Sequence, residues 1–143
     1  MPISWSFDIE SIDWQVLEDL YRVAPLGNKS AAQLQTVFTN SRFKCFAYNG
    51  TELVGAGRAL ADGADCSYIC DVAVLPTWQG TGLGKGIVNR LVEASSDHKK
   101  IILYAVPGKE LFYKKLGFLR MLTAMAIFKD SDAAIARGHL SKT

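Results

Sequence analysis

The sequence predicts a mixed α/β domain around one sheet, and three observations support this prediction. Several short segments alternate apolar and polar residues, as strands do, while other segments carry apolar residues at helical spacing. Turn signals join the strands of the first half, so most of the sheet should be antiparallel. The 143 residues suffice for one hydrophobic core. We therefore expect an α+β arrangement, with a mostly antiparallel central sheet flanked by about four helices.

The chain should begin with one strand and two helices. Residues 3–8 alternate apolar and polar side chains, which indicates a strand. Residues 12–23 carry apolar side chains at helical spacing, and Pro25 is expected to stop this helix. Ser30 is a favourable N-cap, so a second helix should begin immediately after it.

A meander of three strands is expected next. Residues 43–48 and 53–60 have the composition of strands, and the Asn-Gly pair at 49–50 is a strong hairpin signal between them. A second turn follows. The third strand is expected over residues 67–75, because β-forming residues dominate there and Pro76 then ends the strand.

The second half should alternate helices and strands. A glycine-rich stretch over 79–86 leads into a helix, and a strand over 100–105 follows that helix. This crossover is long enough to make the two strands on either side of it parallel. A short helix over 110–116 should end at Gly117 in a left-handed conformation. Residues 118–128 are expected to form the final strands.

Residues 1–130 are expected to form a single domain. The tail over 131–143 is polar and contains alanines, as in a loose helix or a disordered end, and we assign it no role. Lys plus Arg number 16 and Asp plus Glu 14, and the net charge of +2 is too small to indicate nucleic acid or a membrane surface. The sequence shows neither a signal-peptide pattern nor an apolar run of membrane-spanning length.

The three cysteines, Cys45, Cys66 and Cys70, form no CxxC pair and have no His partner at metal-ligand spacing. We therefore expect no metal site. An odd number of cysteines without a framework is typical of a reducing compartment, so a cytoplasmic location is expected. Cys70 lies in an apolar run and is interpreted as a small buried hydrophobe rather than a nucleophile.

The strongest functional signal is the segment from Val72 to Gly86. A strand ends at Pro76, and four glycines follow around the expected start of a helix. The first amides of a helix lack intrahelical partners and sit at the positive end of its dipole. Glycines also let a phosphate approach the backbone without Cβ atoms in the way. The segment is therefore interpreted as an anion site built from main-chain N–H groups.

The pattern of this segment narrows the choice of anion. It lacks the Gly-Lys-Ser/Thr ending of a nucleotide P-loop. Gly80, Gly82 and Gly84 are too evenly spaced for the dinucleotide fingerprint, and hairpins precede the strand. A pyrophosphate site outside these two classes makes coenzyme A a candidate, while a plain glycine-rich turn is the alternative.

Two motifs, in order along the chain, carry a resemblance to a known family. Gln79-x-x-Gly82-x-Gly84 resembles the (Arg/Gln)-x-x-Gly-x-(Gly/Ala) signature of the GNAT superfamily of N-acetyltransferases, and residues 112–118 resemble its closing helix and turn. The segments 68–86 and 112–118 also resemble those of small bacterial members of the family that are related to plastid serotonin and lysine N-acetyltransferases. The resemblance implies the GNAT fold, with acetyl-CoA as co-substrate. It assigns the acetyl-CoA contacts to Val72, Ala73, Val74, Gln79, Gly80, Thr81, Gly82, Leu83, Gly84 and Lys85.

The resemblance also suggests catalytic residues. In the family, the tyrosine that matches Tyr113 lies near the coenzyme sulfur, so Tyr113 is the candidate general acid, and an aromatic anchor is the alternative. Asp71 is the candidate general base, because it is a carboxylate in an otherwise apolar strand. The alternative for Asp71 is a structural bond to turn amides or to a neighbouring cation. A backbone N–H near Val72 is expected to polarise the thioester oxygen.

The resulting hypothesis is an enzyme that transfers acetyl directly from acetyl-CoA to the primary amine of a small molecule. Two alternatives stay open, namely acetylation of protein Lys side chains or N-termini, and a non-catalytic acetyl-CoA sensor that binds a partner protein. In relatives the first two helices, their loop and the last strands build the acceptor pocket. The matching stretches, 23–41 and 121–128, contain no acidic residue, so a polyamine is not indicated. Relatives commonly form homodimers, and we expect no nucleic-acid or membrane partner.

Overall fold

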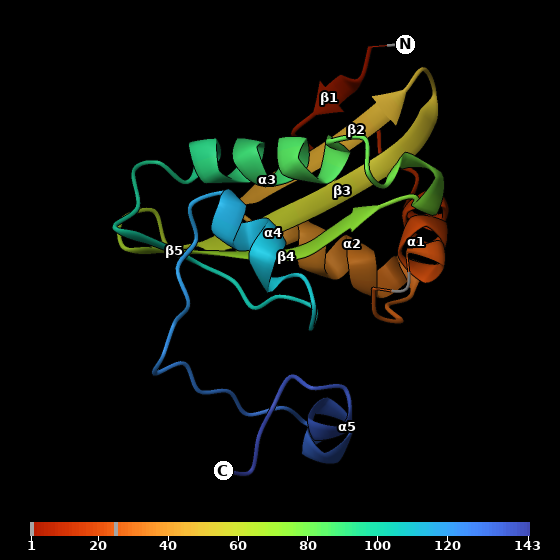
Figure 1. The fold of residues 1–143 in the computed structure, drawn as a ribbon. Coiled ribbons are helices and arrows are strands. Elements are labelled where there is room, and N and C mark those ends of the chain that lie inside the picture. Colours follow the sequence, from red (N-terminus) through yellow and green to blue (C-terminus); the bar gives the residue numbers. More distant parts are fainter. Residues whose placement is uncertain (1, 25) are drawn as a thin grey trace. The chain divides into compact units, whose positions relative to one another are not determined.

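A computed structural model describes residues 2–24 and 26–143 of the chain (Figure 1). The expected helix stop at Pro25 therefore lies outside the described residues. The chain divides into two compact units, Met1–Leu103 and Tyr104–Thr143. The first unit contains the whole sheet.

The five strands of the sheet lie in the order in which they occur along the chain (Figure 1). They are β1 (Ser4–Ser6), β2 (Phe43–Asn49), β3 (Glu52–Ala61), β4 (Cys66–Val74) and β5 (Lys100–Ile102). The first four strands pair antiparallel, whereas β5 pairs parallel to β4 through Cys66–Lys100, Ser67–Ile101 and Tyr68–Ile102. Both the antiparallel meander and the parallel crossover predicted from the sequence are confirmed.

Side-chain caps explain where two helices of the first unit, α1 and α2, begin. These helices are α1 (Trp14–Val23), α2 (Ala31–Thr39), the 3₁₀ turn η1 (Pro76–Trp78) and α3 (Leu83–Ala94). The Asp13 carboxylate caps α1 by accepting from the amides of Gln15 and Val16. Ser30 caps α2 in a capping box with Gln33, so the predicted cap is confirmed.

Helices cover both faces of the sheet. On one face, α1 and α2 enclose the main core (Figure 1). Its buried members are Leu17, Leu20, Tyr21, Leu34, Phe38, Phe46, Leu53, Ala56 and Ala73. On the other face, α3 packs closely against β3 at Gly55 and Gly57. A Cβ on Gly57 would lie only 2.9 Å from Ile87 Cγ2, so glycine is what allows this approach.

The second unit carries two short helices and no strand among its described residues. The helices are α4 (Glu110–Lys115) and α5 (Ser131–Ala136). Gly117 follows α4 with a φ of 99°, which confirms the predicted left-handed stop. The polar tail forms α5, capped by the Asp130 side chain on the amide of Ala133.

The prediction of final strands over residues 118–128 is wrong, because the structure places no strand there. Leu119, Met125 and Ile127 are at least nine-tenths exposed. A strand is stable only when a neighbouring strand completes its hydrogen bonds and other elements cover its apolar face. The sequence displays the apolar residues of such a segment but carries no local signal for its partner.

Candidate functional site

The glycine-rich loop forms an exposed approach to the N-terminus of α3. Gly80 and Gly82 adopt left-handed φ values of 78° and 88°, and Gly82 is the N-cap of the helix. A Cβ at either glycine would find nothing within 4 Å, so the space beside this backbone is open. The first intrahelical bond of α3 runs from the amide of Gly86 to the carbonyl of Gly82, at 3.0 Å. The amides of residues 83–85 precede that bond and, with the helix dipole, favour an anion.

Side chains of the loop hold its shape. Gln79 donates from Nε2 to the carbonyl of Val74 at 3.3 Å, which ties the loop to the end of β4. The Thr81 hydroxyl donates to the carbonyl of Trp78 at 2.5 Å. Leu83 is buried, whereas Lys85 is exposed beside the helix start. Because the side chains of Gln79 and Thr81 are bonded within the loop, only their main-chain groups are available to an anion. Lys85 is the exposed side chain here that can offer a positive charge.

The edge of β4 beside this loop is open within the first unit. On its β5 side, the described residues of β4 pair through Cys66, Ser67 and Tyr68 only. The strand itself continues to Val74. The predicted cofactor residues Val72, Ala73 and Val74 lie on this continuation. An extended ligand can add to such an edge as a further strand.

A β-bulge at Asp71 lies where the open edge begins. Arg58 pairs with Cys70 and Ala56 with Ala73, so Asp71 and Val72 together oppose the single residue Gly57. Asp71 has a φ of 55°, and no other described non-glycine residue has a positive φ. The bulge therefore redirects the strand immediately before the residues predicted to meet the cofactor.

Three side chains hold this bulge. The buried Tyr21 hydroxyl donates to the Asp71 carbonyl at 2.5 Å, and burial, followed by the charge of Asp71, raises the pKa of this phenol. Arg58 Nε donates to Asp71 Oδ2 at 2.8 Å, and Arg58 is itself 8% exposed. Lys29 Nζ lies 3.4 Å from the same oxygen. Because two cations already face the Asp71 carboxylate, it stabilises the bulge, and its role as a general base stays a prediction.

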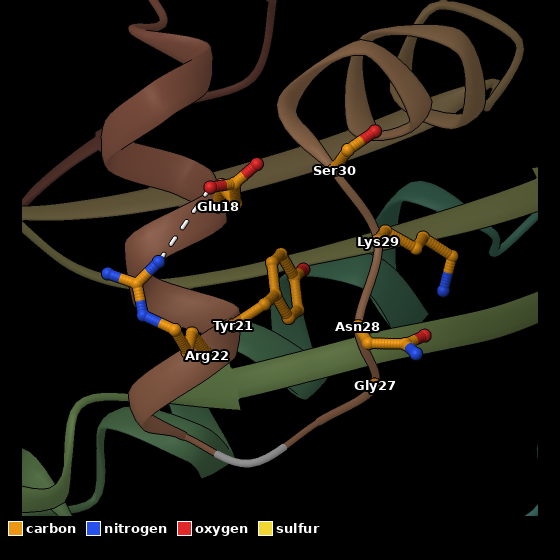
Figure 2. A pocket seen from close by; sticks show the side chains of 7 residues that line it. All are labelled: Glu18, Tyr21, Arg22, Gly27, Asn28, Lys29 and Ser30. Atoms are coloured by element: carbon orange, nitrogen blue, oxygen red, sulfur yellow. Dashed lines mark ion pairs between the residues drawn. The ribbon is translucent and has the colours of Figure 1, made fainter.

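A pocket of about 450 Å³ lies between α1 and the segment that leads into α2 (Figure 2). Its lining residues are Glu18, Tyr21, Arg22, Gly27, Asn28, Lys29 and Ser30. Tyr21 and Lys29 both contact Asp71, so the pocket adjoins β4 at the bulge. This volume is in the range of small-molecule sites.

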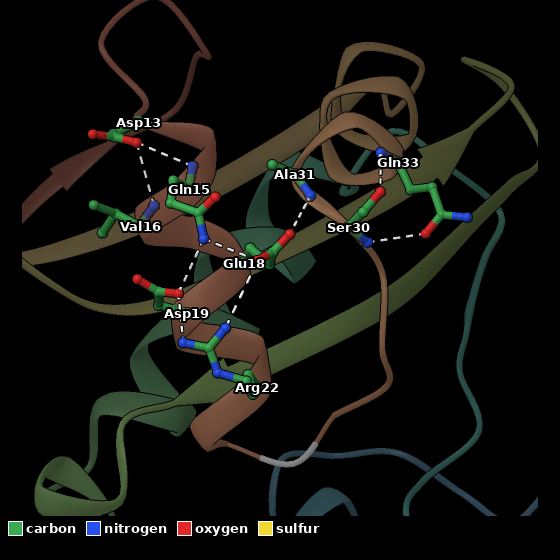
Figure 3. Close-up of polar contacts among 9 residues, drawn as sticks. All are labelled: Asp13, Gln15, Val16, Glu18, Asp19, Arg22, Ser30, Ala31 and Gln33. Carbon is green, nitrogen blue, oxygen red and sulfur yellow. Dashed lines mark hydrogen bonds and ion pairs between the residues drawn. The ribbon is translucent and has the colours of Figure 1, made fainter.

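The carboxylate of Glu18 in this pocket is already bonded by the protein (Figure 3). Its Oε1 accepts from the amide of Ala31 at 2.7 Å, and its Oε2 accepts from Gln15 Nε2 at 2.9 Å. Arg22 donates to Asp19 Oδ1 at 2.6 Å and lies 3.7 Å from Glu18. Glu18 therefore joins α1 to the start of α2, while the Arg22 side chain stays 64% exposed.

Tyr113 belongs to the second unit, whereas the other predicted site residues belong to the first. It is half-buried on α4, with the rings of Phe112 and Phe118 edge-on at 5.0 and 5.8 Å. Burial raises the pKa of its phenol above the ordinary value of 10.0. The hydroxyl is therefore protonated at neutral pH, as a proton donor must be.

Sequence reasoning missed Tyr21 and Arg58, and of the pocket on α1 it indicated only residues 27–30, which lie in the expected acceptor stretch 23–41. One signal was available, since Arg58 is a lone charge in an apolar predicted strand and Asp71 is another in the neighbouring strand. Buried charges are usually paired, so these two could have been matched. Tyr21 offered no such signal, because its helical spacing marks it only as a core residue.

Metal-ligand clusters and membrane-spanning helices are both absent from the part of the chain that the structure describes. No three His, Cys, Asp or Glu side chains converge there in a manner that could hold a metal ion. Among the same residues, none of the helices has the length and apolarity needed to cross a bilayer.

Comparison with known proteins identifies relatives of this chain. The model of the Acetyltransferase (GNAT) domain matches residues 22–129. An uncharacterized N-acetyltransferase ycf52 from Pyropia yezoensis is 39% identical over 72 residues, which cover 49% of this chain and 41% of the relative. Serotonin N-acetyltransferase 2, chloroplastic, from Oryza sativa subsp. japonica is 40% identical over 67 residues, which cover 46% and 34%. The matched regions thus span less than half the length of these two curated relatives.

Solved structures share the fold. A GNAT family acetyltransferase from Streptococcus pneumoniae TIGR4 superposes with a TM-score of 0.74 at 20% identity, covering 90% of this chain and 100% of that chain. The fold class and the family resemblance predicted from the sequence are confirmed by these matches.

Proposed function

Because the chain belongs to the GNAT acetyltransferase family, we propose that it transfers an acetyl group from acetyl-CoA to the primary amine of a small molecule. One observation carries this proposal, namely the juxtaposition of an open strand edge with a glycine-lined helix N-terminus. The edge of β4 ends at Val74, and Gln79 ties that end to the loop leading into α3. A ligand with an extended arm and a pyrophosphate fits both features.

Each part of the donor has residues suited to hold it. The amides of residues 83–85, with Gly80 and Gly82 leaving space, would bind the pyrophosphate, and Lys85 would add a positive charge. The backbone of residues 72–74 would pair with the pantetheine arm. The Tyr21–Asp71–Arg58 contacts hold the bulge and thereby fix the direction of the Val72 amide, which would polarise the thioester oxygen.

The transfer needs a proton for the departing thiolate and a group that takes a proton from the attacking amine. Acetyl-CoA supplies the acetyl thioester, whose C–S bond breaks as the amine nitrogen bonds to the carbonyl carbon. Burial raises the pKa of the Tyr113 phenol, so this group carries its proton at neutral pH and would donate it to the departing thiolate. The amine would lose its proton to Asp71 or to water. Positioning both reactants side by side would itself contribute several kcal/mol of the reduction in barrier.

The pocket beside the bulge favours a small acceptor over a protein. Its volume of about 450 Å³ suits a small molecule, and it adjoins β4 where the thioester is proposed to lie. The two alternatives are acetylation of protein Lys side chains or N-termini, and non-catalytic sensing of acetyl-CoA, and an enzymatic assay distinguishes both from acetylation of a small amine.

We also propose a homodimer and a cytoplasmic location. The exposed apolar side chains of Leu119, Leu122, Met125 and Ile127 support the first, because soluble chains usually cover such a run. The free state of the three cysteines supports the second. Light scattering would report a monomer mass, and cell fractionation a different compartment, if these two proposals are wrong.

The enzymatic test is thiol release from acetyl-CoA across a panel of small amines and Lys-containing peptides. We expect turnover with at least one free amine, and we expect Tyr113→Phe to lower kcat by about 10²-fold or more. Tyr104→Phe is the matched control, since it also removes one phenolic hydroxyl from the second unit. Acetylation of peptides alone would favour the protein-directed alternative. Tight acetyl-CoA binding without any turnover would favour the sensor.

A further inference from the structure

Helix α3 begins without the side-chain cap that α1 and α2 possess. Its N-cap is Gly82, which has no side chain that could accept from the first amides of the helix. A capping side chain would occupy the same N–H groups that a pyrophosphate needs. The buried Leu83 side chain anchors the first turn on the side of the sheet. Any further anchor of this turn has to come from contacts that leave the amides free.

The glycine at position 86 admits such a contact. Gly86 lies within α3 and does not have a positive φ, so the helix itself does not require glycine there. Glycine is also unfavourable inside a helix. A Cβ at this position would lie 3.2 Å from Cη2 and 3.4 Å from Cζ2 of Trp5. Glycine thus lets the indole ring of β1 lie directly against the backbone of the first turn.

Arg90 holds the same indole and the same glycine from the next turn of the helix. Its guanidinium carbon lies 3.7 Å from the centroid of the Trp5 ring, which is a cation–π geometry. Its Nη1 also donates to the carbonyl of Gly86 at 3.2 Å. The amide of Gly86 makes the first intrahelical bond, to the carbonyl of Gly82. Trp5 and Arg90 therefore hold the residue that closes the first turn behind the open amides.

We propose that Trp5, supported by Arg90, is a positioning residue for the pyrophosphate of acetyl-CoA. The inference rests on the proposed donor site and names two residues outside the loop motif that set its geometry. Trp5 pairs with Ala47 of β2, so its indole connects the sheet to the start of the helix. With this contact in place, the amides of residues 83–85 keep a common direction toward the anion, as charge-assisted hydrogen bonds require.

The first test compares two donors that share the thioester. S-acetylpantetheine lacks the pyrophosphate and the nucleotide, so the ratio of its Kd to that of acetyl-CoA measures what these groups contribute. We expect Trp5→Leu, which changes no charge, to lower this ratio about tenfold, on the order of one hydrogen bond to a charged group. The Kd of S-acetylpantetheine itself should keep its wild-type value, because its arm would pair with β4.

A second variant probes the same contact from the helix side. Gly86→Ala also changes no charge, and its Cβ would press on the Trp5 ring. We expect it to lower the Kd ratio alone and to add little to Trp5→Leu, because the ring that the Cβ would meet is then absent.

Hydrogen exchange follows the start of the helix without any donor. The Gly86 amide is bonded to Gly82, so its exchange rate reports whether the first turn stays closed. We expect Trp5→Leu to speed this exchange about tenfold relative to that of the Leu91 amide, which lies in the C-terminal half of the same helix.

Arg42→Gln is the matched control for Arg90→Gln, because each change removes one positive charge. Arg42 likewise lies over an aromatic ring, that of Phe43 at 5.8 Å, but it lies beside Gly63 in the turn between β3 and β4. We expect only Arg90→Gln to lower the Kd ratio and to speed the exchange of the Gly86 amide.

The outcomes separate this inference from the proposed function. If Trp5→Leu keeps the wild-type Kd ratio, or speeds exchange at Leu91 as much as at Gly86, the inference is overturned while the donor site stands. If the wild-type protein binds acetyl-CoA no more tightly than S-acetylpantetheine, the proposed pyrophosphate site fails and the inference fails with it.

Discussion

Loss of one partner of the Arg58–Asp71 pair should be among the most destabilising single changes in the first unit, because it leaves a buried charge without its main counter-ion. The two side chains are 10% and 15% exposed, and their N–O distance is 2.8 Å. Replacing Arg58 by Met would leave the Asp71 carboxylate with Lys29 at 3.4 Å as its remaining cation. Removing one partner of a buried ion pair costs about 3–5 kcal/mol, and we expect about 3 kcal/mol here because Lys29 remains.

A double-mutant cycle measures the pair itself. The variants are Arg58→Met, Asp71→Asn and their combination, with the free energy of unfolding taken from urea titrations. Asn is chosen because it tolerates the left-handed backbone of position 71. We expect a coupling energy of about 1.5–3 kcal/mol, as for contacting residues in one network. The exposed Lys100–Asp65 pair has the same 2.8 Å distance and should show a much smaller coupling.

A coupling energy below about 0.5 kcal/mol at Arg58–Asp71 would refute this reasoning, because that is the value of independent sites. An equal coupling at Lys100–Asp65 would refute it too, since burial is the property that distinguishes the two pairs.

Three further predictions concern the first unit. Backbone N–H groups of Asp65, Ala64 and Cys66 lower the pKa of Asp62 to about 2, so its stabilising effect should be present above about pH 4 and be lost as the pH falls toward 2. Urea titrations should then show that the stability gap between wild type and Asp62→Asn closes over that window. Burial raises the pKa of Cys45 to about 12, so a thiol reagent at pH 8 should modify Cys45 only after unfolding. Gly57→Ala should lower the free energy of unfolding by about 1–3 kcal/mol because its Cβ would meet Ile87, and a loss under 0.5 kcal/mol would contradict the close packing of α3.

The sequence predicted the parts of the fold that local signals determine. The Ser30 cap, the antiparallel meander and the parallel crossover each depend on a short pattern, and each is confirmed. The strands over residues 118–128 depended on a partner elsewhere in space, which no local pattern encodes. The glycine-rich loop was recognisable for the same reason as the caps, since glycine spacing around a helix start is a local property.

The candidate site was predictable on the donor side and much less so on the acceptor side. The donor residues are consecutive in the chain and carry a motif. The acceptor pocket instead combines one face of α1 with residues 27–30, and its link to β4 depends on contacts between residues up to 50 positions apart. The bulge at Asp71 was equally hidden, because a carboxylate in an apolar strand does not reveal a left-handed backbone or two cationic partners.

The most direct test of the central claim is a titration of the ¹⁵N-labelled protein with acetyl-CoA, followed by amide NMR spectra. We expect the largest shifts at the amides of residues 80–86 and 72–74, because these groups are proposed to bind the pyrophosphate and the pantetheine arm. S-acetylpantetheine lacks the pyrophosphate and should shift the strand amides while leaving those of the loop near their free positions. Shifts that cluster elsewhere, or loop amides that do not respond to acetyl-CoA, would contradict the claim.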